Sequence, residues 1–137
     1  MDLRLKFPPV PERARDLADV AVTAAHDISG LSLDYSPESL EEIDALIESF
    51  AAQTSPESVA STLFCFGCYV GEVLIRHLKG EWVLTAASPM KNYAQWPLVT
   101  KMQDGHYWNP IGKVFKRFEE GESESVRYLF SVARGAV

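Results

Sequence analysis

The chain has 137 residues, 47% of them hydrophobic and 23% charged, with a formal net charge of −6 at pH 7. These values are typical of one ordinary folded domain, and they exclude a disordered or a fibrous chain. Its two cysteines do not amount to a disulfide framework, and its start lacks the apolar segment of a signal peptide. We therefore expect a single domain over residues 1–137, located in the reducing cytoplasm.

Charge is divided unevenly along the chain. No Lys or Arg occurs between Asp16 and Ile75, and this segment contains 11 acidic residues. Such a segment usually forms solvated helix faces, or one half of a fold that attracts the other half. The sharper interpretation is an acidic surface that speeds encounter with a basic partner protein. Nucleic acid is disfavoured as a partner, because its binding needs clustered Lys and Arg.

The start of the chain predicts an extended strap followed by a helix. The stretch Phe7-Pro8-Pro9-Val10-Pro11 favours extended structure over residues 1–11. We expect this strap to pack on the domain, and a PxxP ligand is the alternative. A helix is expected over 11–28 and ends at Gly30. Its predicted inward residues are Leu17, Val20, Ala21 and Ala24.

The tetrapeptide Ser-Pro-Glu-Ser, at 36–39 and again at 55–58, predicts two further helix starts. Each copy offers a serine N-cap, a proline at the first helical position and an acid in the first turn. The second helix is apolar on most sides over 59–78, which marks it as the central element. Its apolar run, 59–75, falls short of the roughly 20 residues that cross a bilayer, so we expect no membrane span. The first helix runs to about residue 52, with Leu40, Ile43, Leu46, Ile47 and Phe50 inward.

The second half of the chain predicts a small sheet and two helices. Segments 81–87, 97–102 and 106–108 have strand composition, and Asp104-Gly105 is a turn signal. Helices over 109–120 and 123–134 have Ile111, Val114, Phe115, Phe118, Val126, Leu129, Phe130 and Ala133 inward. The predicted fold class is α+β, with about five helices around the central helix 59–78 and a three-stranded antiparallel meander at 81–108.

One face of the central helix carries Gly67 and Gly71 in a G-x-x-x-G step. Glycine in a soluble helix costs about 1 kcal/mol relative to alanine, so we expect another backbone to approach closely here. A crossing within the chain is favoured over a dimer seam. The chain is therefore expected to be a monomer or a weak homodimer.

The opposite face of the same helix is polar. Five residues lie within an arc of about 100°, namely Cys65, Cys68, Tyr69, Glu72 and Arg76. Glu72 and Arg76 have the favourable i,i+4 spacing, and Tyr69 is close enough to share their hydrogen bonds. A structural ion pair is the favoured interpretation, because a partly buried carboxylate has to be paired. The functional alternative is a cleft in which Glu72 is a base or an anchor and Arg76 holds an anion.

Other chemistry finds little support in the sequence. Cys65 and Cys68 form a C-x-x-C, but redox pairs lie at a helix N-terminus and not two to three turns inside a helix. A zinc site would need two further ligands, and His77 lies nine residues beyond Cys68. His26 and His106 belong to no catalytic spacing, and no phosphate-binding loop occurs. We expect no metal, no cofactor and no catalytic residue.

Three strings of the sequence together resemble a group of small bacterial proteins of unknown function. These strings are the stretch from Gly67 to Arg76, Gly80-Glu81-Trp82, and Asn109-Pro110. The pattern is G-x-Y-x-G-E-x-x-x-R, then G-x-W, then N-P. The resemblance covers about the last seventy-five residues, and it implies a bacterial source and no assigned activity.

The leading functional prediction is a non-enzymatic interaction protein, of the immunity or accessory kind, that binds a basic partner. Its acidic helix over 36–52 would supply Glu41, Asp44 and Glu48, which stand between the apolar rows. The alternative is a small-molecule binder or an enzyme. Its site would combine the polar face with the long connection 88–97, since long loops with aromatic side chains often bind ligands. Its predicted residues are Tyr69, Glu72, Arg76, Tyr93 and Trp96. A structural homodimer through the glycine face is a third possibility.

Overall fold

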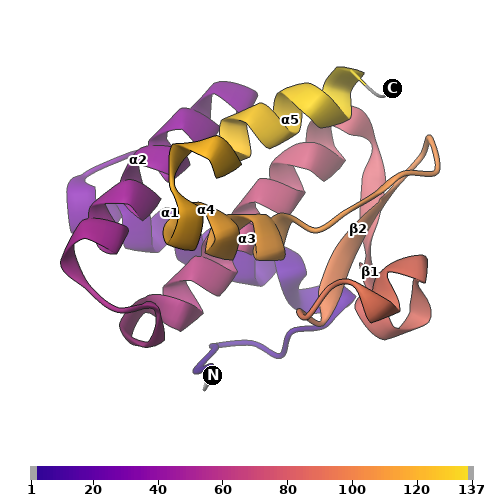
Figure 1. The fold of residues 1–137 in the computed structure, drawn as a ribbon, viewed down its shortest axis with the longest axis horizontal. Coiled ribbons are helices and arrows are strands. Elements are labelled where there is room, and N and C mark those ends of the chain that lie inside the picture. The colour runs from indigo at the N-terminus through magenta and orange to yellow at the C-terminus, as the bar shows by residue number, and fades with distance from the viewer. Residues whose placement is uncertain (1–2, 136–137) are drawn as a thin grey trace.

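A computed structural model describes residues 3–135 and has the predicted α+β architecture. Figure 1 shows α3 crossing the middle of the molecule, the sheet at its right end and the N-terminal strap along the bottom. Within the described residues the chain forms five α-helices and three strands. Their order is α1 (Ala14–Ser29), α2 (Leu40–Gln53), α3 (Pro56–Leu78), β1 (Gly80–Leu84), β2 (Leu98–Met102), β3 (Tyr107–Trp108), α4 (Pro110–Glu120) and α5 (Val126–Gly135).

Helix α3 is the centre of the fold, because every residue from Leu63 to Leu74 is buried. Helices α1 and α4 make the most extensive helix contacts with it. The helix is longer than the apolar run 59–75, and by length and composition alone it is able to cross a membrane. Most of it is nevertheless covered by other elements, as in the core helix of a soluble protein.

Helix α1 packs on α3 mainly through small side chains. Its buried residues are Ala14, Leu17, Ala18, Ala21 and Ala25. The predicted Val20 and Ala24 are only half-buried, and of the two Val20 still packs against the core. The alanine row permits a closer approach of the two backbones than valine does, so the helix turns this row toward α3. In α2, α4 and α5 the predicted inward residues are buried, except that Phe50 is half-buried.

The glycine face of α3 forms a crossing within the chain, as predicted. A Cβ atom at Gly67 would lie 2.5 Å from the Cα atom of Ile111 in α4. At Gly71 a Cβ atom would collide with the Trp82 ring, and Pro110 is the next neighbour. The first turn of α4 and the Trp82 ring thus occupy the space that side chains would fill.

The sheet has the order β1-β2-β3, and both pairs are antiparallel. The first strand ends earlier than predicted, because residues 85–87 turn into a short 3-10 helix. Thr85 ties the start of this turn to the neighbouring strand, since its N–H donates to the Pro97 carbonyl oxygen and its hydroxyl donates to the Trp96 carbonyl oxygen. The connection 88–97 contains another 3-10 turn, Pro89–Asn92, where the Ser88 hydroxyl accepts from the Met90 N–H.

The N-terminal strap packs on the domain, which was the favoured interpretation. Leu3, Leu5 and Phe7 lie against the core, and the Arg4 N–H donates to the Ser61 hydroxyl at 2.7 Å. Residues 1 and 2 of the predicted strap lie outside the described residues.

Replacing Gly67 with alanine tests the crossing. Alanine in place of an unhindered helical glycine stabilises a helix by about 1 kcal/mol. At Gly67 we expect the opposite sign, a loss of about 1–3 kcal/mol, because the methyl group meets the Ile111 backbone. Urea unfolding measures the change. The matched control is Gly135→Ala, since nothing lies within 4 Å of a Cβ atom there. A Gly67→Ala variant more stable than wild type would contradict the crossing.

Candidate functional site

The polar face of α3 forms two hydrogen-bond networks instead of one cleft. In the first, Glu72 Oε1 accepts from Arg76 Nε at 3.1 Å, and Oε2 accepts from the Trp82 indole N–H at 2.9 Å. Glu72 is buried, and both of its carboxylate oxygens are engaged. It is therefore neither a solvent-accessible base nor an open anchor, and the ion pair serves the packing of Trp82.

The second network surrounds Tyr69. Its hydroxyl lies 2.6 Å from the Ser39 hydroxyl and accepts from the Tyr35 N–H at 2.8 Å. Tyr69 does not share the hydrogen bonds of the Glu72 ion pair. Burial raises the pKa of the Tyr69 hydroxyl, so the side chain stays neutral at physiological pH.

Tyr35 connects the two networks, and no sequence pattern predicted its role. Its backbone has a φ of 62°, a left-handed conformation that costs energy for a bulky residue. Three contacts hold Tyr35 there. The Arg76 guanidinium lies 3.7 Å from the centroid of its ring, and the Tyr69 ring stacks on it with centroids 4.5 Å apart. Its carbonyl oxygen lies 2.9 Å from His77 Nε2. Its hydroxyl donates to Asp19 at 2.6 Å. These contacts fix the connection between α1 and α2.

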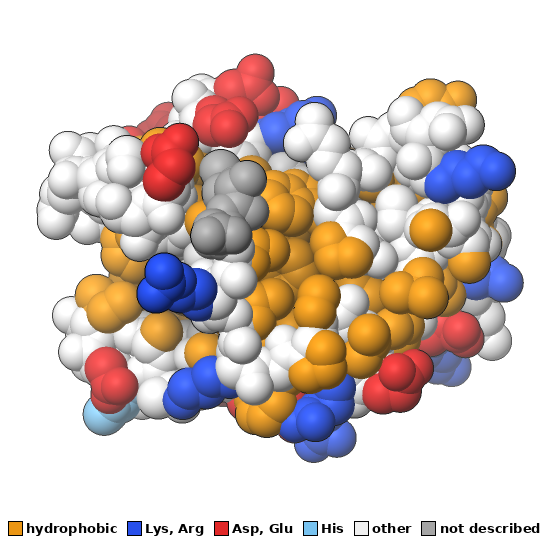
Figure 2. All heavy atoms as spheres, turned by 90° about the horizontal axis from the view of Figure 1, so that it is seen from below, with side chains coloured by type: hydrophobic (Ala, Val, Ile, Leu, Met, Phe, Trp, Pro, Cys, Tyr) orange, Lys and Arg blue, Asp and Glu red, His pale blue; other side chains and the backbone are white. Residues whose placement is uncertain are grey.

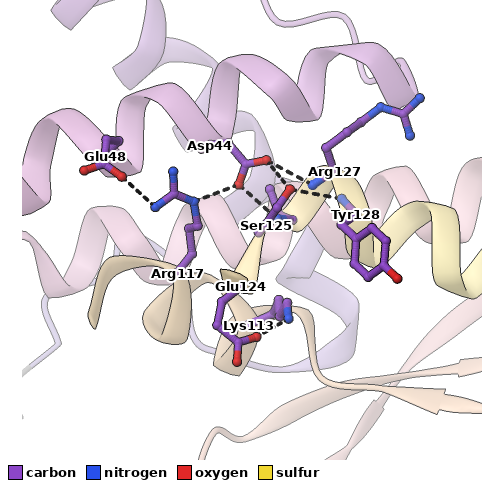
Figure 3. Close-up of polar contacts among 9 residues, drawn as sticks. Asp44, Glu48, Lys113, Arg117, Glu124, Ser125, Arg127 and Tyr128 are labelled. Carbon is purple, nitrogen blue, oxygen red and sulfur yellow. Dashed lines mark hydrogen bonds and ion pairs between the residues drawn. The ribbon is translucent and has the colours of Figure 1, made fainter. Parts of the chain in front are cut away.

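Two of the three α2 carboxylates predicted to bind a partner make contacts inside the protein. Figure 3 shows Arg117 reaching from α4 between the carboxylates of Asp44 and Glu48. Arg117 Nε donates to Asp44 at 3.3 Å, and Nη1 donates to Glu48 at 2.9 Å. Arg117 is only 4% exposed, so these two carboxylates are needed to compensate its buried positive charge.

Asp44 also caps helix α5 (Figure 3). It accepts from the Val126 N–H at 2.9 Å, the Arg127 N–H at 3.2 Å and the Ser125 hydroxyl at 2.7 Å. A carboxylate in this place satisfies N–H groups that have no partner within the helix. Glu41 is exposed and, among the described residues, has no hydrogen-bonding or ionic partner. Asp44 and Glu48 therefore stabilise the fold, while Glu41 stays at the surface.

Two surface hollows are large enough for a ligand, and the first contains the remaining predicted ligand residues. The first, of about 460 Å³, lies between the connection 93–96 and α4. Its lining residues are Tyr93, Gln95, Trp96, Asn109, Gly112, Phe115, Lys116 and Glu119. It contains the predicted Tyr93 and Trp96 but none of the predicted α3 residues, so the predicted ligand set is divided. Figure 2, a view from below Figure 1, shows hydrophobic side chains gathered in the middle of the lower side of the molecule, with charged groups around them.

The second hollow is a groove of about 410 Å³ between the strap and α1. Its lining residues are Lys6, Phe7, Asp16, Asp19, Val20, Thr23, Ala24 and Asp27. The α1 residues that line this groove recur at steps of three and four on the side of the helix opposite the alanine row. This spacing is a sequence signal for the groove that the prediction did not use. Val20 and Ala24, predicted for the core, form part of its apolar lining.

Comparison with protein-family models, curated proteins and solved structures finds no match. The predicted resemblance to a group of bacterial proteins therefore stays a prediction. Several of its motif residues nevertheless have structural roles here. Gly71 leaves room for the Trp82 ring, Glu72 accepts from the Trp82 indole N–H, and the Asn109 side chain caps α4 by accepting from the Gly112 N–H at 3.1 Å.

The two cysteines are free and buried in the interior of α3. Burial raises the pKa of the Cys65 thiol from 9.0 to about 11, and it also raises the pKa of the Cys68 thiol. Residues 3–135 contain no group of three His, Cys, Asp or Glu side chains that could hold a metal ion. The thiols thus behave as small hydrophobic groups.

Replacing Asp44 tests the internal role of the α2 carboxylates. We expect Asp44→Ala to lower the free energy of unfolding by about 3 kcal/mol, because it removes the cap of α5 and one partner of buried Arg117. Asp44→Asn should lose less, since it keeps an oxygen acceptor. The control is Glu41→Lys on the same helix, expected to change stability by about 0.5 kcal/mol or less. Chemical denaturation measures all three, and equal effects of Asp44→Ala and Glu41→Lys would contradict the assignment.

The raised thiol pKa values predict slow labelling and a loss of stability in alkali. The native thiols should react with a thiol reagent far more slowly than in the unfolded chain, because the thiolate is the reacting form. A group whose pKa is higher in the folded state stabilises the fold fully below its unfolded pKa, and this contribution is lost as pH rises. Stability should therefore fall between pH 9 and about 11, and less so in Cys65→Ala. Labelling at the unfolded rate would place the thiols at the surface.

Proposed function

We propose that this protein is a non-enzymatic interaction protein, of the immunity or accessory kind, that binds a basic segment of a partner protein in the groove between the strap and α1. The observation that carries the proposal is the composition of this groove. Three carboxylates and one ammonium group line it, together with the apolar side chains of Phe7, Val20 and Ala24.

This combination suits arginine and lysine side chains. Both have an apolar stem that packs on aliphatic surface while the charged end stays near water or a carboxylate. Val20 and Ala24 offer the aliphatic surface, and Asp27 is exposed beside them. The Phe7 ring already receives a guanidinium, that of Arg13, at 4.2 Å from its centroid. This internal pair shows that the groove suits a basic group, while Val20, Ala24 and Asp27 are left to contact the apolar and the charged part of a partner's side chain.

The electrostatics of the chain favour the same partner. Asp44 and Glu48 are bound to Arg117, and Glu72 is bound to Arg76. Asp16 and Asp19 also have partners, Arg13 and the Tyr35 hydroxyl, but they stay at the surface and line the groove. The groove lining has three carboxylates against one ammonium group, and a net negative field along a groove raises the association rate of a basic partner.

The polar side chains of the two α3 networks are already hydrogen-bonded within the protein, which supports a binding protein over an enzyme. The engaged Glu72 carboxylate leaves no free base there, and buried Tyr69 is bonded to Ser39 and Tyr35. The small-molecule alternative is left with the aromatic hollow, which is a separate site.

The experiment uses a short peptide rich in arginine and leucine, and a matched peptide with glutamate in place of arginine. Amide chemical shifts of the labelled protein map where each peptide binds. We expect the basic peptide to shift residues of the strap and α1, and the acidic peptide to shift none of them. The variant Thr23→Lys/Asp27→Lys places two like charges along the groove. It should weaken binding of the basic peptide at least about tenfold at low salt and less at higher salt.

The matched control is Glu41→Lys/Ala45→Lys on α2. Both variants change exposed positions with i,i+4 spacing, and both change the net charge by the same amount. Retained binding in the control with loss in the α1 variant supports the groove. Equal weakening in both variants would show that only the net charge matters, and the groove would then not be the docking surface.

A further inference from the structure

A second site is independent of the acidic groove. We infer that the hollow between the connection 93–96 and α4 binds a small planar aromatic compound that carries a carboxylate. Its volume of about 460 Å³ lies within the usual range of small-molecule sites, roughly 300–1,000 Å³. The residues that line it supply an aromatic wall, an exposed aromatic rim and donor groups.

The aromatic wall is held in place before any ligand arrives. The Trp96 ring stacks on the Phe115 ring, with centroids 4.3 Å apart and planes at 20°. The Phe64 ring meets Trp96 edge-on at 6.0 Å. The Trp96 backbone is fixed as well, because its carbonyl oxygen accepts from the Thr85 hydroxyl at 2.6 Å. A rigid aromatic pair offers an added ring a stacking partner at little cost in conformational entropy.

Tyr93 forms the rim and is the most exposed large hydrophobic side chain among the described residues, at 81%. It follows the 3-10 turn Pro89–Asn92, and its N–H donates to the Met90 carbonyl oxygen at 2.9 Å. The backbone is therefore anchored while the ring extends into solvent. An exposed aromatic ring beside an aromatic wall is the arrangement that covers a flat ligand from its second side.

Donor groups follow along α4, from Asn109 past Gly112 to Lys116. Asn109 Oδ1 accepts from the Gly112 N–H, which leaves the Nδ2 group as a donor without an acceptor among the described residues. Lys116 is exposed, and no carboxylate of the described residues lies within 4 Å of its ammonium group. Gly112 has no side chain between them. A carboxylate on the ligand would thus meet an amide donor and a free positive charge.

Two other charges limit the ligand class. Lys113, one turn before Lys116, already forms an ion pair with Glu124. Glu119 lies one turn beyond Lys116 and also lines the hollow, where it repels a second negative group. The lining therefore favours one carboxylate on a single ring system over a polyanion such as a nucleotide phosphate chain.

The experiment compares three probes that share one ring: indole-3-acetate, indole and tryptamine. The indole N–H signals of the labelled protein report on each tryptophan separately. We expect indole-3-acetate to bind most tightly and tryptamine most weakly. Indole-3-acetate should shift the Trp96 signal and leave the signal of Trp82, which is buried beside Glu72, unchanged.

Two variants separate the charge from the ring contacts. Lys116→Gln should weaken indole-3-acetate binding about tenfold and leave indole binding unchanged, because it removes only the positive charge. Tyr93→Ala should weaken all three probes, and its exposure means that the fold is kept. The control is Lys91→Gln, an exposed lysine of the same connection that does not line the hollow.

Three results would overturn the inference. They are the absence of any Trp96 shift at millimolar probe, tryptamine binding as tightly as indole-3-acetate, and Lys116→Gln behaving like Lys91→Gln. None of them bears on the basic peptide and the α1 groove, so the two proposals stand or fall separately.

Discussion

The close approach of α4 to the glycine face of α3 determines the rest of the fold. With no side chain at Gly67, the Ile111 backbone lies against α3, and with none at Gly71 the Trp82 ring fits beside it. Trp82 then supplies the N–H that engages the buried Glu72 carboxylate. The same crossing fixes the direction of α4, and with it the positions of Arg117 on one side and Phe115 on the other. Both the internal ion pairs and the aromatic hollow follow from this contact.

The acidic segment serves two purposes in this framework. Asp44 and Glu48 neutralise a buried arginine that comes from the more basic C-terminal part of the chain. Attraction between the two halves of the fold therefore accounts for part of the charge asymmetry. The carboxylates of α1 remain at the surface, and they do so next to apolar groups. This difference in surroundings separates stabilising charges from those available to a partner.

Sequence periodicity predicted most of the architecture, because apolar spacing and capping residues are local signals. The inward rows of α4 and α5, and the Asn109 cap, follow from such signals alone. The role of Asp44 does not, since its partners lie more than 70 residues further along the chain and the pattern of α2 alone is the same for a solvated residue.

Other parts of the site also escaped prediction for physical reasons. Val20 and Ala24 fit the apolar period as well as Ala18 and Ala25 do, and only the closeness of α3 decides between the two rows. The left-handed backbone of Tyr35 is stabilised by tertiary contacts from α1 and α3. The connection 88–97 is a predicted ligand surface, but its α4 partners are not predicted, because the G-x-x-x-G step indicates a close crossing without saying which helix crosses.

The cap of α5 by Asp44 also has a consequence for the order in which the chain assembles. The residues that bind Asp44 from the start of α5 lie 81 to 83 positions after it, so this contact closes one of the largest loops in the molecule. During synthesis, α2 emerges long before Ser125 and holds a carboxylate whose partners do not yet exist. Docking of the last helix is thus the step that completes the electrostatic core, and a chain interrupted before residue 125 keeps α2 without its α5 partners.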